Sequence, residues 1–255
     1  MIRYFPAFGL GLGGLIIWQI IVDYFDIPKY LFPSPVNVLN SFFAHGGDML
    51  IHLGVTMEIA VSAFFIAVVV GVGIAFIMVQ NEKLENAIFP YVIIIQVTPV
   101  VALAPLIVLL INDTFWALVL CAVLIAIFPV ISNTILGLKS VPPELMILFK
   151  MYNAGKVQTF LRLRIMNALP YFFGSLKITS GLSIVGAVVG GFVAGSTGSN
   201  SGISYDILQD GYNLEVSRMF CSVFLLSIAG ILFFSVTSYF NWLFLRKWHE
   251  SLVRM

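Results

Sequence analysis

The sequence predicts an all-α protein that crosses a membrane several times. Of its 255 residues, 60% are hydrophobic and only 10% are charged, and the mean hydropathy is +1.03. A soluble globular domain is far more charged than this, so the composition excludes that class. Six apolar runs have about the length that a helix needs to cross some 30 Å of hydrocarbon. We therefore expect a single transmembrane domain over residues 1–255.

The six apolar runs give the expected spans in chain order. They are Ala7–Asp23, Val55–Val79, Ile88–Ile111, Phe115–Asn133, Leu176–Gly195 and Phe220–Leu245. Two short amphipathic helices are expected at the outer surface, over Val36–Phe43 and over Ile203–Tyr212. The second of these helices places Asp206 and Asp210 one turn apart.

The third run contains three prolines, at positions 90, 99 and 105. Proline removes a helical hydrogen bond and clashes with the preceding turn, so this span is expected to be kinked or broken. Pro99 and Pro105 then either bend a purely structural helix or expose backbone carbonyls along a pathway for solute.

The fifth run is rich in glycine at helical spacing. The pairs Gly186–Gly190 and Gly191–Gly195 both have three residues between them. Small residues at this spacing let two helix backbones approach closely within a membrane. Helix packing is the expected role of these glycines, and lining a solute path is the alternative.

The basic residues predict the orientation of the chain. With the N-terminus in the cytoplasm, six spans return the C-terminus to the cytoplasm, and ten Lys and Arg side chains fall on that side against two outside. Cytoplasmic loops of membrane proteins carry such an excess. The inner ten are Arg3, Lys83, Lys139, Lys150, Lys156, Arg162, Arg164, Arg246, Lys247 and Arg254, and the outer two are Lys29 and Arg218.

The longest polar stretch, residues 139–170, holds five of these basic residues. Within it, Glu144 suits the start of a helix, because a carboxylate is favourable at the positive end of the helix dipole. Leu145, Met146, Leu148 and Phe149 can then share one apolar face. Such a face on a cytoplasmic loop indicates a surface for a partner protein, and a plain structural linker is the alternative.

The sequence shows no motif for chemistry of its own. It has no phosphate-binding loop and no zinc-protease or serine-hydrolase motif, and its two cysteines lie in apolar runs as small buried side chains. Glu58 is the one candidate for an acid within a span, and an interfacial position suits it better. No catalytic, cofactor or metal site is expected. An ion-coupled carrier or channel remains the alternative to a conduit driven by other subunits, and an intramembrane enzyme has almost no residue support.

The motifs along the chain resemble those of the permease subunits of bacterial ABC importers that work with a binding protein. The similarity is strongest to the branch that handles nitrate, sulfonates, taurine, bicarbonate and thiamine or riboflavin precursors. The motifs that carry it are Leu31-Phe-Pro-Ser-Pro35, Gln96-Val-Thr-Pro-Val-Val-Ala-Leu-Ala-Pro-Leu106, Pro143-Glu144-Leu145, Ala168-Leu169-Pro170, Leu176-Lys177-Ile178, Gly186-Ala-Val-Val-Gly190 and Phe192-Val-Ala-Gly195.

The resemblance implies a type I importer permease with a coupling helix in the loop 139–170. The family's Glu-Ala-Ala positions fall on Ile147, Leu148 and Phe149, and its glycine falls on Asn153, which also tolerates positive φ. The residues implied to contact the ATPase are Glu144, Leu145, Leu148, Phe149 and Asn153.

The resemblance also implies partners. They are ABC ATPase subunits, which bind ATP and Mg, an extracytoplasmic binding protein that contacts Asp206 and Asp210, a second permease copy and the lipid bilayer, but no nucleic acid. The implied location is the bacterial inner membrane, with both termini in the cytoplasm.

Overall fold

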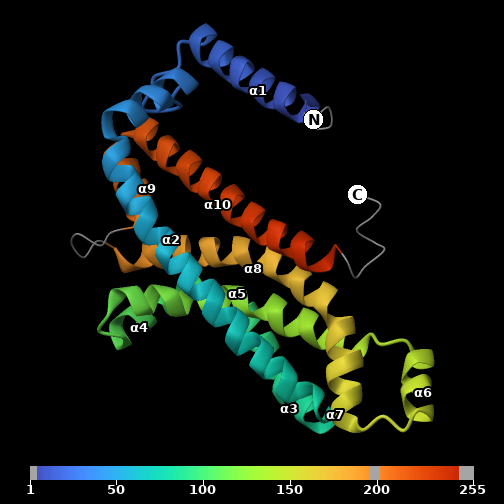
Figure 1. Cartoon of the computed structure of the whole chain (residues 1–255). Helices are drawn as coiled ribbons and strands as arrows, with labels where there is room; N and C mark the ends of the chain where they lie inside the picture. The colour runs from blue at the N-terminus through green and yellow to red at the C-terminus, as the bar shows by residue number, and fades with distance from the viewer. Residues whose placement is uncertain (1–4, 196–201, 247–255) are drawn as a thin grey trace. The chain divides into compact units, whose positions relative to one another are not determined.

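The structure is a computed structural model that describes residues 5–195 and 202–246, and every regular element in these ranges is helical (Figure 1). The absence of strands in the described residues agrees with the all-α prediction. In chain order, the elements are α1 (Phe5–Tyr24), α2 (Pro35–Val79), α3 (Glu82–Val97), α4 (Val100–Leu110), α5 (Thr114–Lys139), α6 (Pro143–Met151), α7 (Lys156–Thr159), the π-helix η2 (Phe160–Arg164), α8 (Ile165–Ala194), α9 (Ile203–Tyr212) and α10 (Val216–Leu245).

Within the described ranges, four helical segments are long and apolar enough to cross a membrane: α2, α5, the continuous segment Lys156–Ala194 and α10. The bent pair α3–α4 makes a fifth span if it is counted as one. The first predicted run corresponds to a shorter apolar helix, Gly9–Tyr24. The six predicted runs therefore all lie on helices, and the multi-span character of the chain is confirmed.

Helix α2 differs from the sequence prediction. The expected surface helix Val36–Phe43 and the second span belong to one continuous helix of 45 residues. Pro35 occupies its first position, where proline fits a helix, and no further proline follows before Pro90. Nothing therefore ends the helix between the two predicted pieces. Its length is more than twice the roughly 20 residues that a span requires, so it continues beyond the hydrocarbon core.

The third predicted span is broken, as its prolines indicate. Helix α3 ends at Val97, Thr98 and Pro99 are extended, and α4 begins at Val100 with a bend of 96° between the two helices. Pro90 and Pro105 are accommodated inside α3 and α4. The break therefore occurs at Pro99. Asp113 then begins α5 by accepting a hydrogen bond from the Trp116 amide over 3.3 Å.

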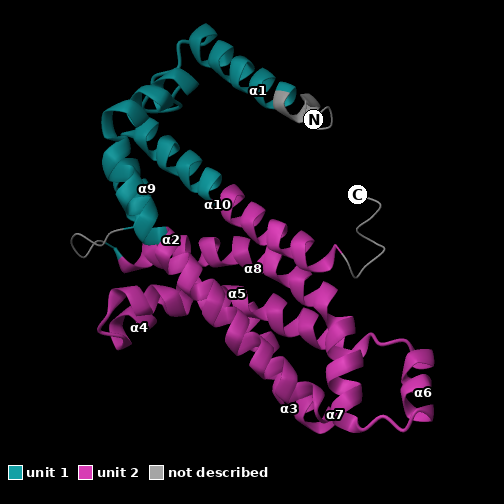
Figure 2. Cartoon of the chain, viewed as in Figure 1, with its two compact units in different colours: residues 1–56, 195–229 teal, residues 57–194, 230–255 magenta. Residues whose placement is uncertain are grey.

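The chain divides into two compact units (Figure 2). Unit 1 comprises residues 1–56 and 195–229, and unit 2 comprises residues 57–194 and 230–255. Unit 1 joins two segments that are distant in sequence, and apolar composition alone does not show this pairing. The assignment of the whole chain to one transmembrane domain stays a prediction.

The core of unit 2 is the antiparallel pair α5 and α8. A β-carbon on Gly186 would lie 2.5 Å from the Ala122 backbone, and one on Gly137 would lie 2.8 Å from the Ala168 backbone. Both distances are shorter than real β-carbons show, so the two backbones are in close contact near both ends of the pair. Cys121 is buried in this core, where α4 also packs, and is a free thiol.

The core of unit 1 is aromatic. The indole ring of Trp18 lies 5.5 Å from the ring of Phe32, 6.0 Å from Phe220 and 5.9 Å from Phe224, measured between centroids. Aromatic pairs at these separations are favourable beyond the area they bury. Cys221 is buried in a neighbouring cluster with Met49 and is also a free thiol. These contacts join α1 to the start of α10.

Candidate functional site

Helix α6 is the predicted helix of the polar loop, and its ends have local causes. Pro143 fits the first turn, and Glu144 places a carboxylate there. At the other end, Asn153 has a φ of 51°. The amide of Ala154 donates to the Phe149 carbonyl and that of Asn153 to the Lys150 carbonyl, each over 3.0 Å. This pattern is a Schellman cap, and it confirms that Asn153 adopts the positive φ expected at the family's glycine position.

The helix presents two different faces. Leu145 and Leu148 are 41% and 44% exposed, and Phe149 is half-buried beside them on the same face. Met146, Ile147 and Lys150 line a pocket instead. Met146 was expected to share the first face, but it lies one turn from Lys150 on the pocket side. The exposed leucines give α6 an apolar surface that no described residue covers.

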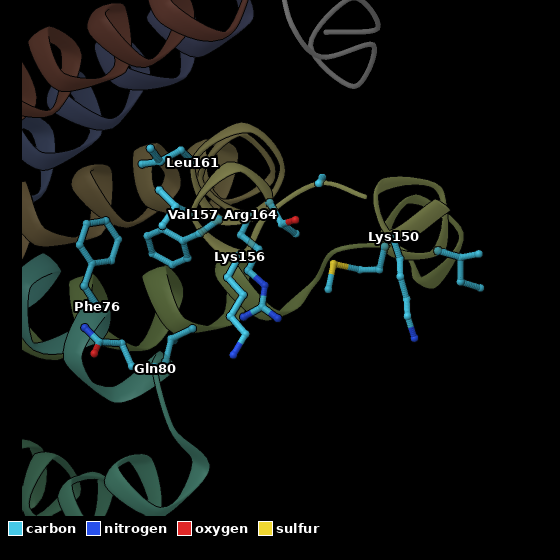
Figure 3. A pocket seen from close by; sticks show the side chains of 13 residues that line it. Phe76, Gln80, Lys150, Lys156, Val157, Leu161 and Arg164 are labelled. Carbon is cyan, nitrogen blue, oxygen red and sulfur yellow. The ribbon is translucent and has the colours of Figure 1, made fainter. Parts of the chain in front are cut away.

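The pocket lies between the end of α2, helix α6 and the segment α7–η2, all within unit 2, and has a volume of about 1150 Å³ (Figure 3). Its cations are Lys150 from α6, Lys156 from α7 and Arg164 from η2. Figure 3 shows Lys156 and Arg164 extending in the same direction near Gln80, with Lys150 on the separate α6 segment. A π-helix is rare and often marks a functional position, and here it carries Arg164.

A smaller cavity of about 480 Å³ adjoins this pocket and contains acidic residues. Lys139 Nζ lies 2.5 Å from Glu85 Oε2 there. This pair fixes the end of α5 to the start of α3. Asn167 adds a hydrogen bond of 2.8 Å to the Ser140 hydroxyl, which holds the start of α8 beside the same turn. The two ends of the polar loop are therefore held in place, at Lys139 and at Asn167, whereas α6 itself has no buried residue.

The predicted glycines have different surroundings. Gly186 meets the Ala122 backbone, and a β-carbon on Gly190 would lie 3.0 Å from the Leu118 side chain. Gly191 is buried. Gly195 was expected to pack, but within the described residues nothing lies within 4 Å of its β-carbon position. With a φ of 64° it follows the last residue of α8, a conformation that glycine adopts freely. Packing is therefore the structural role of Gly186 and Gly190, and helix termination is that of Gly195.

Asp206 and Asp210 lie on α9, whose bounds match the predicted helix Ile203–Tyr212. Both are buried and both have partners inside unit 1. Asp206 Oδ2 lies 2.6 Å from His52 Nδ1, and Asp210 Oδ1 lies 3.4 Å from Arg218 Nε. The structure thus gives these carboxylates an internal role. The exposed large hydrophobic side chains at this end of α9 are Tyr212 and Leu214.

Helix α9 is fixed at its N-terminal end as well. The Ile203 amide donates to the Thr56 hydroxyl over 2.9 Å. A β-carbon on Gly202 would lie 2.4 Å from that hydroxyl oxygen, so only glycine fits there without a shift. The sequence did not predict these contacts of Thr56, His52 and Arg218. The partners of Thr56 and His52 lie more than 140 residues away along the chain.

The pKa of Asp210 is raised to about 6, chiefly because burial disfavours its charged form. The nearby Asp206 and Glu215 carboxylates act in the same direction, and Arg218 and His45 act against it. Arg218 is the main opposing charge, and its Nε lies 3.4 Å from Asp210 Oδ1 without forming a hydrogen bond. The second oxygen of Asp210 has no partner in the described residues. The folded protein therefore holds a proton on Asp210 at pH values where the unfolded chain has lost it.

Asp210→Asn should remove a pH dependence of stability. Because the folded pKa is above the ordinary value of 3.8, the contribution of Asp210 is fully present below about pH 4 and is lost as pH rises through about 6. Asn keeps the shape and cannot titrate. The unfolding midpoint in detergent, taken as variant minus wild type, should rise from pH 4.5 to pH 7. Taking this difference cancels the titration of all groups that both proteins share. A difference that does not change with pH would show that Asp210 is not the source of the pH dependence.

Among the described residues, no three His, Cys, Asp or Glu side chains come together as a metal site requires. The pocket residues Lys156, Arg164 and Gln80 were not predicted from the sequence to share a site. The concentration of basic residues in the loop 139–170 is the signal that points toward them, but only the fold shows which of them share a cavity.

Residues 67–247 match the family described as the binding-protein-dependent transport system inner membrane component. The chain is 33% identical to the formylaminopyrimidine transport permease protein ThiX of Halalkalibacterium halodurans, over 87% of each chain. It is 32% identical to the riboflavin transport system permease protein RibX of Chloroflexus aurantiacus, over 76% of this chain and 74% of that one. Identity to the nitrate import permease protein NrtB of Synechocystis is 25%, over 86% and 81%.

A solved structure has the same fold. A chain of the inward-facing MetNI methionine ABC transporter superposes with a TM-score of 0.60, covering 76% of this chain and 92% of that chain. The two sequences are 19% identical. At this identity, the likeness concerns the fold alone.

Proposed function

The chain belongs to the family of inner-membrane components of binding-protein-dependent transport systems, and we propose that its α6 surface couples it to an ATPase. It is a permease subunit of an ABC importer, a transport component rather than a catalyst, with the fold of a type I importer. Its partners are an ATPase and a binding protein.

The observation that carries the proposed coupling role is the exposed apolar face of α6. A short helix between two membrane segments, with Leu145 and Leu148 uncovered and Phe149 beside them, resembles the helix-in-groove mode of recognition. The elements that flank α6 are held together by the Lys139–Glu85 ion pair and by the hydrogen bond from Asn167 to the Gly137 carbonyl, so movement of α6 would pass to α5 and α8 through its short connections. ATP and Mg would be bound by the partner ATPase, and hydrolysis there would move α6.

The ten-to-two distribution of basic residues supports a cytoplasmic position for α6 and for both termini. It favours a position for α9 on the opposite side, toward the binding protein. A second copy of this chain would complete the solute pathway, and α4, with Pro99 and Pro105, would border it.

Cysteine labelling should test this orientation. After Cys121 and Cys221 are replaced by Ser, single cysteines at Lys156 and Tyr212, both exposed, should react with a membrane-impermeant thiol reagent from opposite sides of the membrane. In intact cells with a permeabilised outer barrier, only the position 212 variant should react. Reaction of both positions from outside would reject the six-span topology.

The proposed solute is a small heterocyclic vitamin precursor. Permeases named for formylaminopyrimidine and riboflavin are above 30% identical to this chain, whereas the nitrate permease is at 25%. A small inorganic or organic anion is the second class, since the nitrate, sulfonate and bicarbonate permeases also match.

Reconstitution tests the function as a whole. The permease and its ATPase are reconstituted in liposomes, and the binding protein is added outside. These liposomes should take up labelled formylaminopyrimidine only when ATP is present on the same side of the membrane as the ATPase. A Walker-lysine variant of the ATPase is the control and should abolish uptake. Uptake driven by a sodium or proton gradient without the ATPase would favour the ion-coupled carrier instead.

A further inference from the structure

The pocket beside α6 combines positive charge with an apolar wall. Lys150, Lys156 and Arg164 line it from three different elements, with Lys150 across the pocket from the other two (Figure 3). Among the described residues that line it, none is acidic. Three cations within one cavity repel each other, and an anion bound among them would relieve this repulsion.

The three cations are not neutralised by the described part of the chain. The ion pairs of the described residues involve other side chains, and none includes Lys150, Lys156 or Arg164. Arg164 also lines the smaller cavity that holds Glu82 and Glu85. Glu85 is paired with Lys139, and Glu82 forms no ion pair with Arg164 among the described residues. The positive charge of the pocket is therefore available to a ligand.

A second wall of the pocket, on the α7–η2 segment itself, is apolar and uncovered. Val157 and Leu161, one turn apart on α7–η2, are 72% and 51% exposed. The rings of Phe76 and Phe160 also line the pocket, with their centroids 5.8 Å apart. Figure 3 shows Val157 and Leu161 on the α7–η2 segment that also carries Lys156 and Arg164. A ligand that fits both walls carries a negative head and an apolar body.

We propose that this pocket binds an anionic phospholipid of the cytoplasmic leaflet. Its phosphate lies among Lys150, Lys156 and Arg164, and its acyl chains lie along Val157 and Leu161. Basic pockets between membrane helices on the cytoplasmic side bind such headgroups. The inference rests on the cytoplasmic position of α6 in the proposed function.

The division of α6 into two faces favours lipid over an acidic segment of the ATPase. The pocket uses Met146, Ile147 and Lys150, whereas Leu145 and Leu148 point to the other side of the helix. A lipid in the pocket and an ATPase on the exposed face can therefore be bound at the same time.

The test measures lipid binding to the full-length permease alone, purified in detergent, so that it does not depend on the ATPase. Native mass spectrometry with added cardiolipin or phosphatidylglycerol should show retained lipid, and phosphatidylethanolamine with the same acyl chains should bind much more weakly. Glycerol phosphate, which has the phosphate but no acyl chains, is tested in the same way, and it should bind more weakly than the lipid. Replacing one pocket cation by Gln should weaken binding about fivefold, and replacing all three about a hundredfold.

Arg162 provides a matched control. It lies on the same π-helix as Arg164 but does not line the pocket, so Arg162→Gln should leave lipid binding unchanged while Arg164→Gln weakens it. Lys150→Arg keeps the charge and should retain binding.

Equal effects of the two arginine variants, equal binding of zwitterionic lipid, or glycerol phosphate binding as tight as lipid would each overturn the proposal. The proposal would also be overturned if the variant with all three cations replaced by Gln lost ATPase co-purification but still bound lipid. Because lipid binding and ATPase docking are read separately, failure of one leaves the other measurable.

Discussion

Gly186→Ala should strongly destabilise the membrane domain, although it adds a single methyl group. The new β-carbon would lie 2.5 Å from the Ala122 backbone, and backbone cannot move aside as a flexible side chain can. Helices α5 and α8 must therefore separate where they are in closest contact. Overpacking of this kind costs about 1–3 kcal/mol, and a forced shift of the helix pair lies at the upper end.

Gly181→Ala is the matched control for this change. Gly181 lies in the same helix, and nothing in the described structure lies within 4 Å of its β-carbon position. Alanine favours helix over glycine by about 1 kcal/mol, so this variant should be neutral or slightly more stable. Unfolding in mixed micelles of sodium dodecyl sulfate measures both. Gly190→Ala should be intermediate, because its β-carbon would first meet the mobile end of the Leu118 side chain, at 3.0 Å. A wild-type unfolding midpoint for Gly186→Ala would reject the close helix contact.

Leu148→Asp and Phe149→Ala together should uncouple the permease from its ATPase. Aromatic anchors at interfaces contribute about 2 kcal/mol or more on truncation to Ala, which corresponds to about 30-fold weaker binding for Phe149 alone. The aspartate adds a charge in the centre of the same apolar face. Co-purification of the ATPase should be lost, and solute-stimulated ATP hydrolysis with it.

The fold of the subunit should survive these two changes, because α6 has no fully buried residue. Insertion and thermal unfolding of the double variant should match the wild type. Leu214→Asp is the control: this leucine is also exposed, 64%, and its positive φ of 59° suits Asp at least as well. It should leave ATPase binding intact. Undiminished co-purification with the double variant would show that α6 is not the docking element.

The helices followed from the sequence where local rules decide them. Six apolar runs correspond to segments that are helical, and the proline triplet predicted the broken third span, with the break at Pro99. The bounds of α9 were also predicted. The positive φ of Asn153 agrees with the glycine position that the family resemblance implied. The junction of the surface helix with the second span was missed, since polar residues such as His45 and Asp48 interrupt the hydropathy of α2 without interrupting its helix.

The amino-acid sequence by itself determined the class of this protein, its helices and the position of its basic loop, because composition and periodicity act through nearby residues. Only the tertiary structure decided which residues share a site. Asp206 meets His52 across 154 positions, and Gly186 rather than Gly195 meets a backbone. Lys150, Lys156 and Arg164 surround one pocket while Arg162, between them in the sequence, does not. Such distinctions depend on the direction of each side chain from its helix and on contacts between distant segments, which spacing alone leaves open.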